Sequence, residues 1–193
     1  MTVPSIKGAA IQSVFADILQ LEESGRIATE QLEARLEAQD LDCLRMKLDV
    51  ARWYPLTTYD RCTRLLCDHH AGDRDAYLRQ RGNAAAKRLT DSGLYPQLEL
   101  VDRIDEKRAA QRLLSDVKLM VTAFGSMLNV GTLTASQGEG AAPRLEVREA
   151  SKLPDVLAPV ILGMIDHLAA RIDPKTPSYR VERASPDLWV YIR

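Results

Sequence analysis

The segment "PDVLAPVILGMIDHLAARI", residues 154–172, decides the fold class. Its apolar residues recur at intervals of three and four, which predicts an amphipathic helix over about 155–171. The buried face of that helix is expected to hold Val156, Val160, Ile161, Met164, Ile165 and Leu168. A helix with so broad an apolar face needs a sheet or further helices to cover it.

Stretches that alternate apolar and polar residues flank this helix on both sides. Upstream, "MLNVGTLTAS" (127–136) and "RLEVREA" (144–150) are joined by the flexible "QGEGAAP", and together they predict a β-hairpin. Downstream, "YRVERASPDLWVYIR" (179–193) predicts a second hairpin that turns at residues 185–187. Two hairpins around one helix predict an α+β fold, in which a ββαββ antiparallel four-stranded sheet carries a packed helix.

Helices are expected to fill the chain before the sheet. Residues 1–50 form a helical N-terminal extension, 51–125 a second helical part, and 126–193 the ββαββ part. Pro55 is expected to start a helix that runs from about Leu56 to His70. Gly82 weakens the middle of a later helix unless close packing explains it. With 193 residues the chain is long enough for one substantial α+β domain.

Composition narrows the choice of partner and compartment. The formal net charge of −1 gives no overall field for nucleic acid or an anionic membrane. The arginines and lysines between Arg74 and Arg112 are interleaved with acidic residues, so a solvated helix face is expected there. No segment approaches the length of a membrane span. Three cysteines without paired spacing favour a reducing, cytoplasmic location.

The most reactive residue types lie in "ARWYPLTTYDRCTRLLCDHH", residues 51–70. Cys62 and His69 are seven residues apart, and Cys67 and His70 are three apart, so one helix presents two candidate ligands at a time. Zinc is normally held by four ligands from separate turns or elements. We therefore expect no metal site. Cys62 is expected to pack in the core, while the histidines close the helix, and any further role of this cluster stays open.

Motifs for catalysis are missing from the sequence. It contains no GxSxG nucleophile elbow and no phosphate loop of the GxxxxGK[ST] type. Cys67 and His70 lie at the negative end of their predicted helix, which raises the pKa of a thiol. We therefore expect a protein that is not an enzyme.

Two segments carry a resemblance to a known family, namely "WYPLTTYDRCTRLL" (53–66) and "RQRGNAAAKRLTDSGLY" (79–95). With the following strand pair, helix and strand pair, they resemble a paralogous family of uncharacterised proteins from myxobacteria and related deltaproteobacteria. The matching residues are Trp53, Tyr54, Pro55, Tyr59, Gly82, Ala86, Gly93 and Tyr95. The layout also resembles the fold shared by haem-nitric-oxide-binding domains, vinyl-reductase-like ligand-binding domains and a vesicle-tethering subunit. This resemblance implies sensing, scaffolding or assembly.

Resemblance to the haem-binding domains raises the question of a cofactor. That class implies a helix-borne histidine for the iron and a Tyr-x-Ser-x-Arg motif for the propionates. His167 lies on the C-terminal helix, which is the wrong element for that role, and the motif is absent. We therefore expect no haem and no other cofactor.

Two functions follow from these observations. The first is a non-enzymatic signalling or scaffold module that acts through protein partners, with a small apolar ligand. The alternative is a dedicated small-molecule sensor or carrier domain with an internal apolar pocket. Aromatic residues with polar tips suit either role. The candidates for ligand binding or an interface are Trp53, Tyr54, Tyr59, Tyr95, Trp189 and Tyr191.

The closing strand "DLWVYIR" raises the question of self-association. Trp189 and Tyr191 are expected on one face of the strand, and Leu188, Val190 and Ile192 on the other. Both faces are apolar, and one helix covers only one of them, so the second face predicts a homodimer or a partner-bound form. The competing interpretation is a monomer whose N-terminal helices cover that face.

Overall fold

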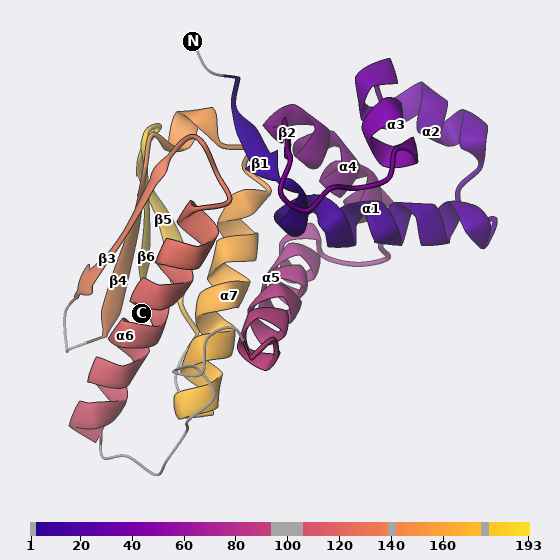
Figure 1. Ribbon diagram of the computed structural model, residues 1–193. Coiled ribbons are helices and arrows are strands. Elements are labelled where there is room, and N and C mark those ends of the chain that lie inside the picture. The colour runs from indigo at the N-terminus through magenta and orange to yellow at the C-terminus, as the bar shows by residue number, and fades with distance from the viewer. Residues whose placement is uncertain (1–2, 94–105, 139–141, 175–177) are drawn as a thin grey trace. The chain divides into compact units, whose positions relative to one another are not determined.

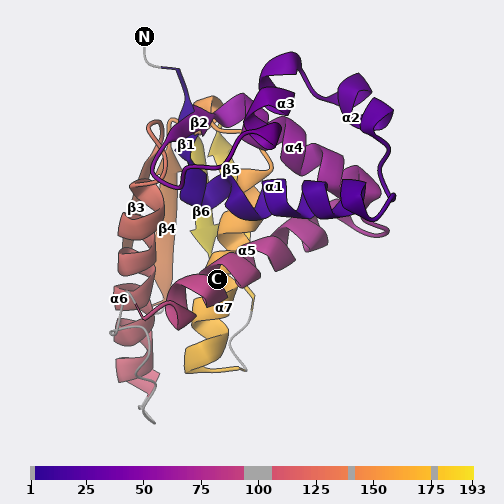
Figure 2. The same cartoon turned by 45° about the vertical axis from the view of Figure 1, so that its right-hand side comes forward.

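The computed structural model describes residues 3–93, 106–138, 142–174 and 178–193, without the side chains of 106 and 107. The chain divides into two compact units. The N-terminal unit comprises Met1–Arg74 and Met127–Val130, and the C-terminal unit comprises Asp75–Ser126 and Gly131–Arg193. Figure 1 and Figure 2 show the elements of each unit in two views. The prediction of a single α+β domain stays a prediction.

The N-terminal unit combines a two-stranded ribbon with helices. Its elements are β1 (Ser5–Lys7), α1 (Gly8–Glu23), α2 (Thr29–Arg35), α3 (Ala38–Arg45), β2 (Trp53–Pro55) and α4 (Leu56–His69). β1 and β2 pair antiparallel. The apolar stripe of α1 is buried at Ile11 and Ile18, and Leu19 on its margin is 37% exposed. Gly25 ends this helix region in the left-handed conformation that glycine adopts without strain.

The predicted helix after Pro55 is present as α4, and it supplies much of the core of this unit. Tyr59, Cys62 and Leu66 are all buried, as one helical face requires. Pro55 precedes the helix with an extended backbone, and the N–H of Leu56 donates to the Pro4 carbonyl. β1 and the start of α4 are thereby tied together.

The C-terminal unit contains the sheet. Its elements are α5 (Arg74–Asp91), α6 (Glu106–Gly125), β3 (Thr132–Gln137), β4 (Pro143–Arg148), the short 3₁₀ helix η3 (Ala150–Lys152), α7 (Leu157–Ile172), β5 (Arg180–Ser185) and β6 (Leu188–Ile192). The strand order is β3-β4-β6-β5, and all pairs are antiparallel. α6 and α7 lie beside each other over one face of the sheet (Figure 1). The predicted α+β fold with two hairpins around a packed helix is confirmed.

Close packing of α5 on α7 explains the glycine in the middle of α5. A Cβ atom built on Gly82 would lie 1.9 Å from the Val160 carbonyl oxygen, and one on Gly163 equally close to the Arg79 carbonyl oxygen. The two helices therefore meet backbone to backbone, an approach that only glycine permits. The side chain of Arg79 also joins α5 to α7, because its guanidinium pairs with Asp166 of α7 and donates a hydrogen bond to the Tyr179 carbonyl.

The face of the sheet away from α6 and α7 corrects one sequence-based prediction. In register, Val190 lies between Glu146 and Glu182. Arg144 and Arg148 both pair with Glu146, and Val190 is only 3% exposed beneath this charged surface. The second face was expected to be apolar. That prediction is wrong for the sheet as a whole, because the neighbouring strands place charged side chains beside the single apolar column of β6. A homodimer stays a prediction.

Candidate functional site

The aromatic candidates of the N-terminal unit do not gather around a cavity. Tyr54 is buried against Phe15 in an edge-to-face pair with 6.0 Å between ring centroids, and its hydroxyl accepts a 3.0 Å hydrogen bond from the Asp49 N–H. Tyr59 lies on α4 and is buried in the core of the N-terminal unit. Trp53 is 43% exposed. Tyr95 lies outside the described residues.

Trp189 and Tyr191 of β6 are core residues of the C-terminal unit. Tyr191 is fully buried, its hydroxyl donates to the Ala158 carbonyl of α7, and burial raises its pKa. Trp189 is 3% exposed, and the guanidinium of Arg183 lies 5.9 Å from its ring centroid. Tyr191 therefore ties β6 to α7, and Trp189 contacts Arg183 of the neighbouring strand β5, so both act as core residues.

The cysteines and histidines of α4 remain separate groups. Burial raises the pKa of Cys62 to about 12, so this thiol stays protonated at neutral pH. The Nδ1 atom of His69 lies 2.9 Å from the Leu65 carbonyl, and the N–H of His70 closes the helix onto the Leu66 carbonyl. Among the described residues no three side chains of His, Cys, Asp or Glu gather as a metal site. The absence of a metal stays a prediction.

Two polar atoms of the C-terminal unit are buried without a hydrogen-bond partner in the described structure. They are Nε2 of His167 and the hydroxyl of Tyr179. Burial lowers the pKa of His167, and the positive charge of Arg171 adds to this effect. Burial raises the pKa of Tyr179 to about 12, while the positive charge of Arg193 opposes the rise. Unsatisfied buried groups are uncommon and often mark functional positions.

A cavity of about 390 Å³ lies at one end of the sheet, close to Arg193. The ends of β3, β4, β5 and β6 form it, with the backbone at Gly138 and Ala142. Its lining residues are Gln137, Gly138, Ala142, Pro143, Arg144, Arg180, Ile192 and Arg193. We call it the sheet-end cavity. Its volume falls within the range of small-molecule sites, about 300–1,000 Å³.

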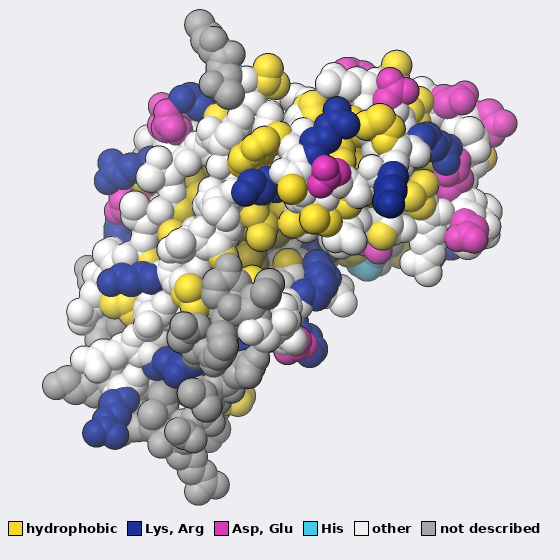
Figure 3. Space-filling model, viewed as in Figure 1, with side chains coloured by type: hydrophobic (Ala, Val, Ile, Leu, Met, Phe, Trp, Pro, Cys, Tyr) yellow, Lys and Arg dark blue, Asp and Glu magenta, His cyan; other side chains and the backbone are white. Residues whose placement is uncertain are grey.

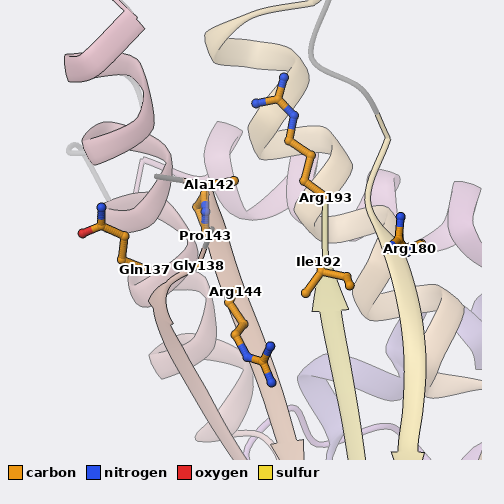
Figure 4. Close-up of a pocket in the computed structure, with 8 residues that line it drawn as sticks. All are labelled: Gln137, Gly138, Ala142, Pro143, Arg144, Arg180, Ile192 and Arg193. Atoms are coloured by element: carbon orange, nitrogen blue, oxygen red, sulfur yellow. The ribbon is translucent and has the colours of Figure 1, made fainter. Parts of the chain in front are cut away.

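Three arginines give the sheet-end cavity its chemistry. Arg180 lies opposite Ile192 in the strand register, and Arg144 directly precedes Leu145, which lies opposite Tyr191. In Figure 4 Arg144 extends from β4 toward β6, Arg193 extends beyond the end of β6, and Gln137 points away. Arg144 pairs with Glu146 and Arg180 with Glu182, whereas Arg193 has no carboxylate partner among the described residues. Guanidinium groups favour carboxylate and phosphate ligands.

A second cavity lies within the N-terminal unit and has a volume of about 300 Å³. It is lined by Cys67 with charged side chains, namely Arg35, Arg64, Asp68 and Arg74. Arg35 is paired with Asp68, and Arg64 with Asp60. Both of these cavities are therefore cationic, and the internal apolar pocket of the alternative function stays a prediction.

The basic stretch between Arg74 and Arg112 is only in part the solvated face that was expected. Lys87 pairs with Asp91 and Arg112 with Asp116, both at i,i+4 spacing. Arg79 instead joins α5 to α7 through Asp166. None of the helices within the described residues combines the length and the apolar character that crossing a bilayer demands.

Comparison with known proteins identifies the class of fold. No family model matches the chain, and no curated protein matches it significantly. A solved structure described as "Cs H-NOX mutant with unnatural amino acid 4-cyano-L-phenylalanine at site 5" superposes with a TM-score of 0.61. The match covers 96% of this chain and 94% of that chain at 12% identity. The chain therefore has a fold like that of a haem-nitric-oxide-binding domain, as the resemblance predicted.

The described residues do not fit the haem of that class. The chain has only three histidines, His69, His70 and His167, and none of them lines either cavity. Nε2 of His167 is buried without a hydrogen-bond partner in the described structure, and burial and the charge of Arg171 lower the pKa of this side chain. Cys67 does line a cavity, but the other side chains of that lining are all charged.

The arginines of the sheet-end cavity were not among the residues singled out from the sequence. The two hairpins already indicated this position, because antiparallel pairing places the start of β4, the start of β5 and the end of β6 at the same end of the sheet. Alternation then assigns Arg144, Ile192 and Arg180 to one face. Only the register, which the sequence does not fix, brings the three into one row.

Proposed function

We propose that this chain is a small-molecule-binding sensor domain whose ligand is anionic and binds at the sheet-end cavity. The observation that carries the proposal is the H-NOX-like fold over nearly the whole chain. A fold that other proteins use to bind ligands supports a ligand-binding role here by analogy. Fold likeness alone does not choose the ligand, and the chemistry of the cavity does.

Anion binding is supported by the charges that surround the cavity. Arg193 adds a cation without a carboxylate partner among the described residues, and Arg144 and Arg180 supply two more guanidinium groups at the same edge. A carboxylate or phosphate ligand at the cavity would pair with Arg193, whereas an apolar ligand would leave this guanidinium without an anionic partner.

The test is a thermal-unfolding screen of the purified chain. The probes are inorganic phosphate, a nucleoside monophosphate, a dicarboxylate and a fatty acid. At least one anion is expected to raise the midpoint, because a ligand that binds only the folded state stabilises it. Arg193→Gln is expected to abolish the shift. The matched control is Arg148→Gln, which lies on β4 outside the cavity and is expected to keep it.

No shift with any anion would contradict the proposal, and so would a shift that Arg193→Gln leaves intact. An absorbance spectrum of the same sample tests haem directly, and a haem band would replace the proposal with the chemistry of the related class. The scaffold role, a protein partner, the lack of enzymatic activity, the cytoplasmic location and the kinship with deltaproteobacterial proteins stay predictions.

A further inference from the structure

The segment between α3 and β2 exposes an unusual combination of side chains. Met46, Val50 and Trp53 are 43%, 51% and 43% exposed, and they lie within eight consecutive residues. The same part of the N-terminal unit carries Lys47, Arg52 and, on β1 opposite Trp53, Lys7. We call these six residues the Trp53 surface. Figure 3 shows hydrophobic and cationic side chains, with an acidic side chain among them, over the part of the chain that joins α3 to β2.

The cations of the Trp53 surface differ from most of those elsewhere in the N-terminal unit, where only Arg26 also has no carboxylate partner among the described residues. Arg35, Arg45, Arg61 and Arg64 each pair with a carboxylate. Lys7, Lys47 and Arg52 have no carboxylate partner among the described residues. The ammonium of Lys7 lies 5.3 Å from the Trp53 ring centroid, and Arg52 lies over the ring of Tyr54.

Backbone hydrogen bonds hold this segment in place. The N–H groups of Gly8 and Ala9 donate to the carbonyls of Arg52 and Val50, and the N–H of Asp49 donates to the buried Tyr54 hydroxyl. A Cβ atom on Gly8 would lie 2.1 Å from the Asp49 carbonyl oxygen, so the segment lies directly against the start of α1. A surface fixed in advance loses little conformational entropy on binding.

We infer that the Trp53 surface docks a protein partner that carries acidic side chains around an apolar pocket, with the Trp53 indole as the anchor. Tryptophan and arginine dominate the binding energy of protein interfaces. The three cations have no carboxylate partners among the described residues, and acidic side chains of a protein partner would provide the complementary negative charge. This inference is independent of the proposed ligand.

A lipid bilayer is the less favoured occupant. Each lysine or arginine near an anionic membrane contributes about 1 kcal/mol, and lipid-binding clusters usually hold about four to eight such residues. The Trp53 surface has three, beside one aromatic side chain. This is enough to orient a protein partner but weak as a membrane anchor.

The experiment selects random-sequence peptides displayed on phage against the full chain. Enriched peptides are expected to combine Asp or Glu with large apolar residues. Calorimetry on the best synthetic peptide should show a loss of affinity of about tenfold or more for Trp53→Ala, with partial retention in Trp53→Phe. The charge reversal Lys7→Glu/Lys47→Glu/Arg52→Glu should abolish binding.

The matched control reverses three cations outside the surface, Arg26→Glu/Lys118→Glu/Arg148→Glu, and is expected to keep most of the affinity at the same net charge. Circular dichroism checks that each variant is folded. Enriched peptides without acidic residues, or binding that Trp53→Ala leaves intact, would overturn the inference. Trp53-dependent binding to phosphatidylserine-containing vesicles, without peptide binding, would identify a membrane instead and would equally overturn it.

Discussion

Among the described residues, each of the two units buries one aspartate beside an arginine, and the pKa values of the two carboxyl groups shift in opposite directions. Asp40 of the N-terminal unit is fully buried and accepts hydrogen bonds from Arg61, from the Thr58 hydroxyl at 2.6 Å and from the Glu37 N–H. Asp116 of the C-terminal unit is 6% exposed and accepts a 2.9 Å hydrogen bond from Arg112, one turn earlier on α6.

The pKa values of the two groups differ in direction. Burial raises the pKa of both carboxyls. At Asp40 the hydrogen bonds from Arg61, Thr58 and Glu37 outweigh burial and hold the pKa below its usual value. At Asp116 burial prevails over Arg112, and the pKa is raised. The comparison teaches that the number of hydrogen bonds to the ionised form, more than the presence of one arginine, decides whether a buried carboxylate stabilises its unit.

Removal of the better-bonded aspartate is expected to have the largest effect. Asp40→Ala should lower the free energy of unfolding by about 3 kcal/mol, because Arg61, Thr58 and the Glu37 N–H lose their shared acceptor. Chemical denaturation monitored by circular dichroism measures the loss. A loss below about 1 kcal/mol would show that Arg61, which also pairs with Glu37, compensates for the missing carboxylate.

The opposite pKa directions predict opposite responses to acid. The stabilisation from Asp40 is present above its unfolded pKa of about 3.9 and is lost as pH falls through its lower folded pKa. The penalty at Asp116 is instead relieved as pH falls through its raised folded pKa. Denaturation of the wild type, Asp40→Asn and Asp116→Asn across pH 7 to about 3 tests this. If the free energy of unfolding depended on pH in the same way in all three proteins, the two aspartates would not differ as described.

One of the hydrogen bonds to Asp40 comes from the Thr58 hydroxyl on α4, and its contribution is measured by removing that hydroxyl. Thr58→Val should cost about 1–2 kcal/mol, since it removes a donor to a buried charge while keeping the side-chain shape. Thr63 on the same helix is the matched control, because it is also fully buried but its hydroxyl has no hydrogen-bond partner in the described structure. Thr63→Val should be neutral or stabilising. Equal losses in both variants would refute the hydrogen-bond account.

The smallest effect is expected at the poorly bonded aspartate. Asp116→Asn should change the free energy of unfolding by less than about 1 kcal/mol at neutral pH, and the change should favour the folded state. Asparagine keeps the size of the side chain and removes the charge that burial disfavours. A loss as large as that of Asp40→Ala would mean that Arg112 alone stabilises a buried carboxylate.

The sequence predicted the ββαββ part well because its signal is local. The apolar spacing of residues 155–171 and the alternation in both hairpins depend only on near neighbours, whereas the strand register was not predicted. Gly82 was recognised as a helix position that needs close packing, and the crossing with Gly163 supplies it. These features were predictable because each one constrains the backbone at a known position.

The sites depended on contacts that sequence spacing does not reveal. Asp40 and Arg61 lie 21 residues apart, and only the packing of α3 on α4 joins them. The candidate aromatics were chosen by residue type, and the structure buries Tyr54, Tyr59, Trp189 and Tyr191 as core while it leaves Trp53 exposed. Residue type gave the chemistry of each side chain, but burial, which requires the fold, separated core from surface.

The most direct test of the proposed function is an amide NMR map of the full chain titrated with the anion that gives the largest thermal shift. The account predicts chemical-shift changes that cluster at the Gly138, Ala142 and Ile192 amides and are absent in Arg193→Gln. Shifts that cluster instead at Cys67 and Asp68, in the second cavity, would contradict it, as would a spectrum that no anion changes.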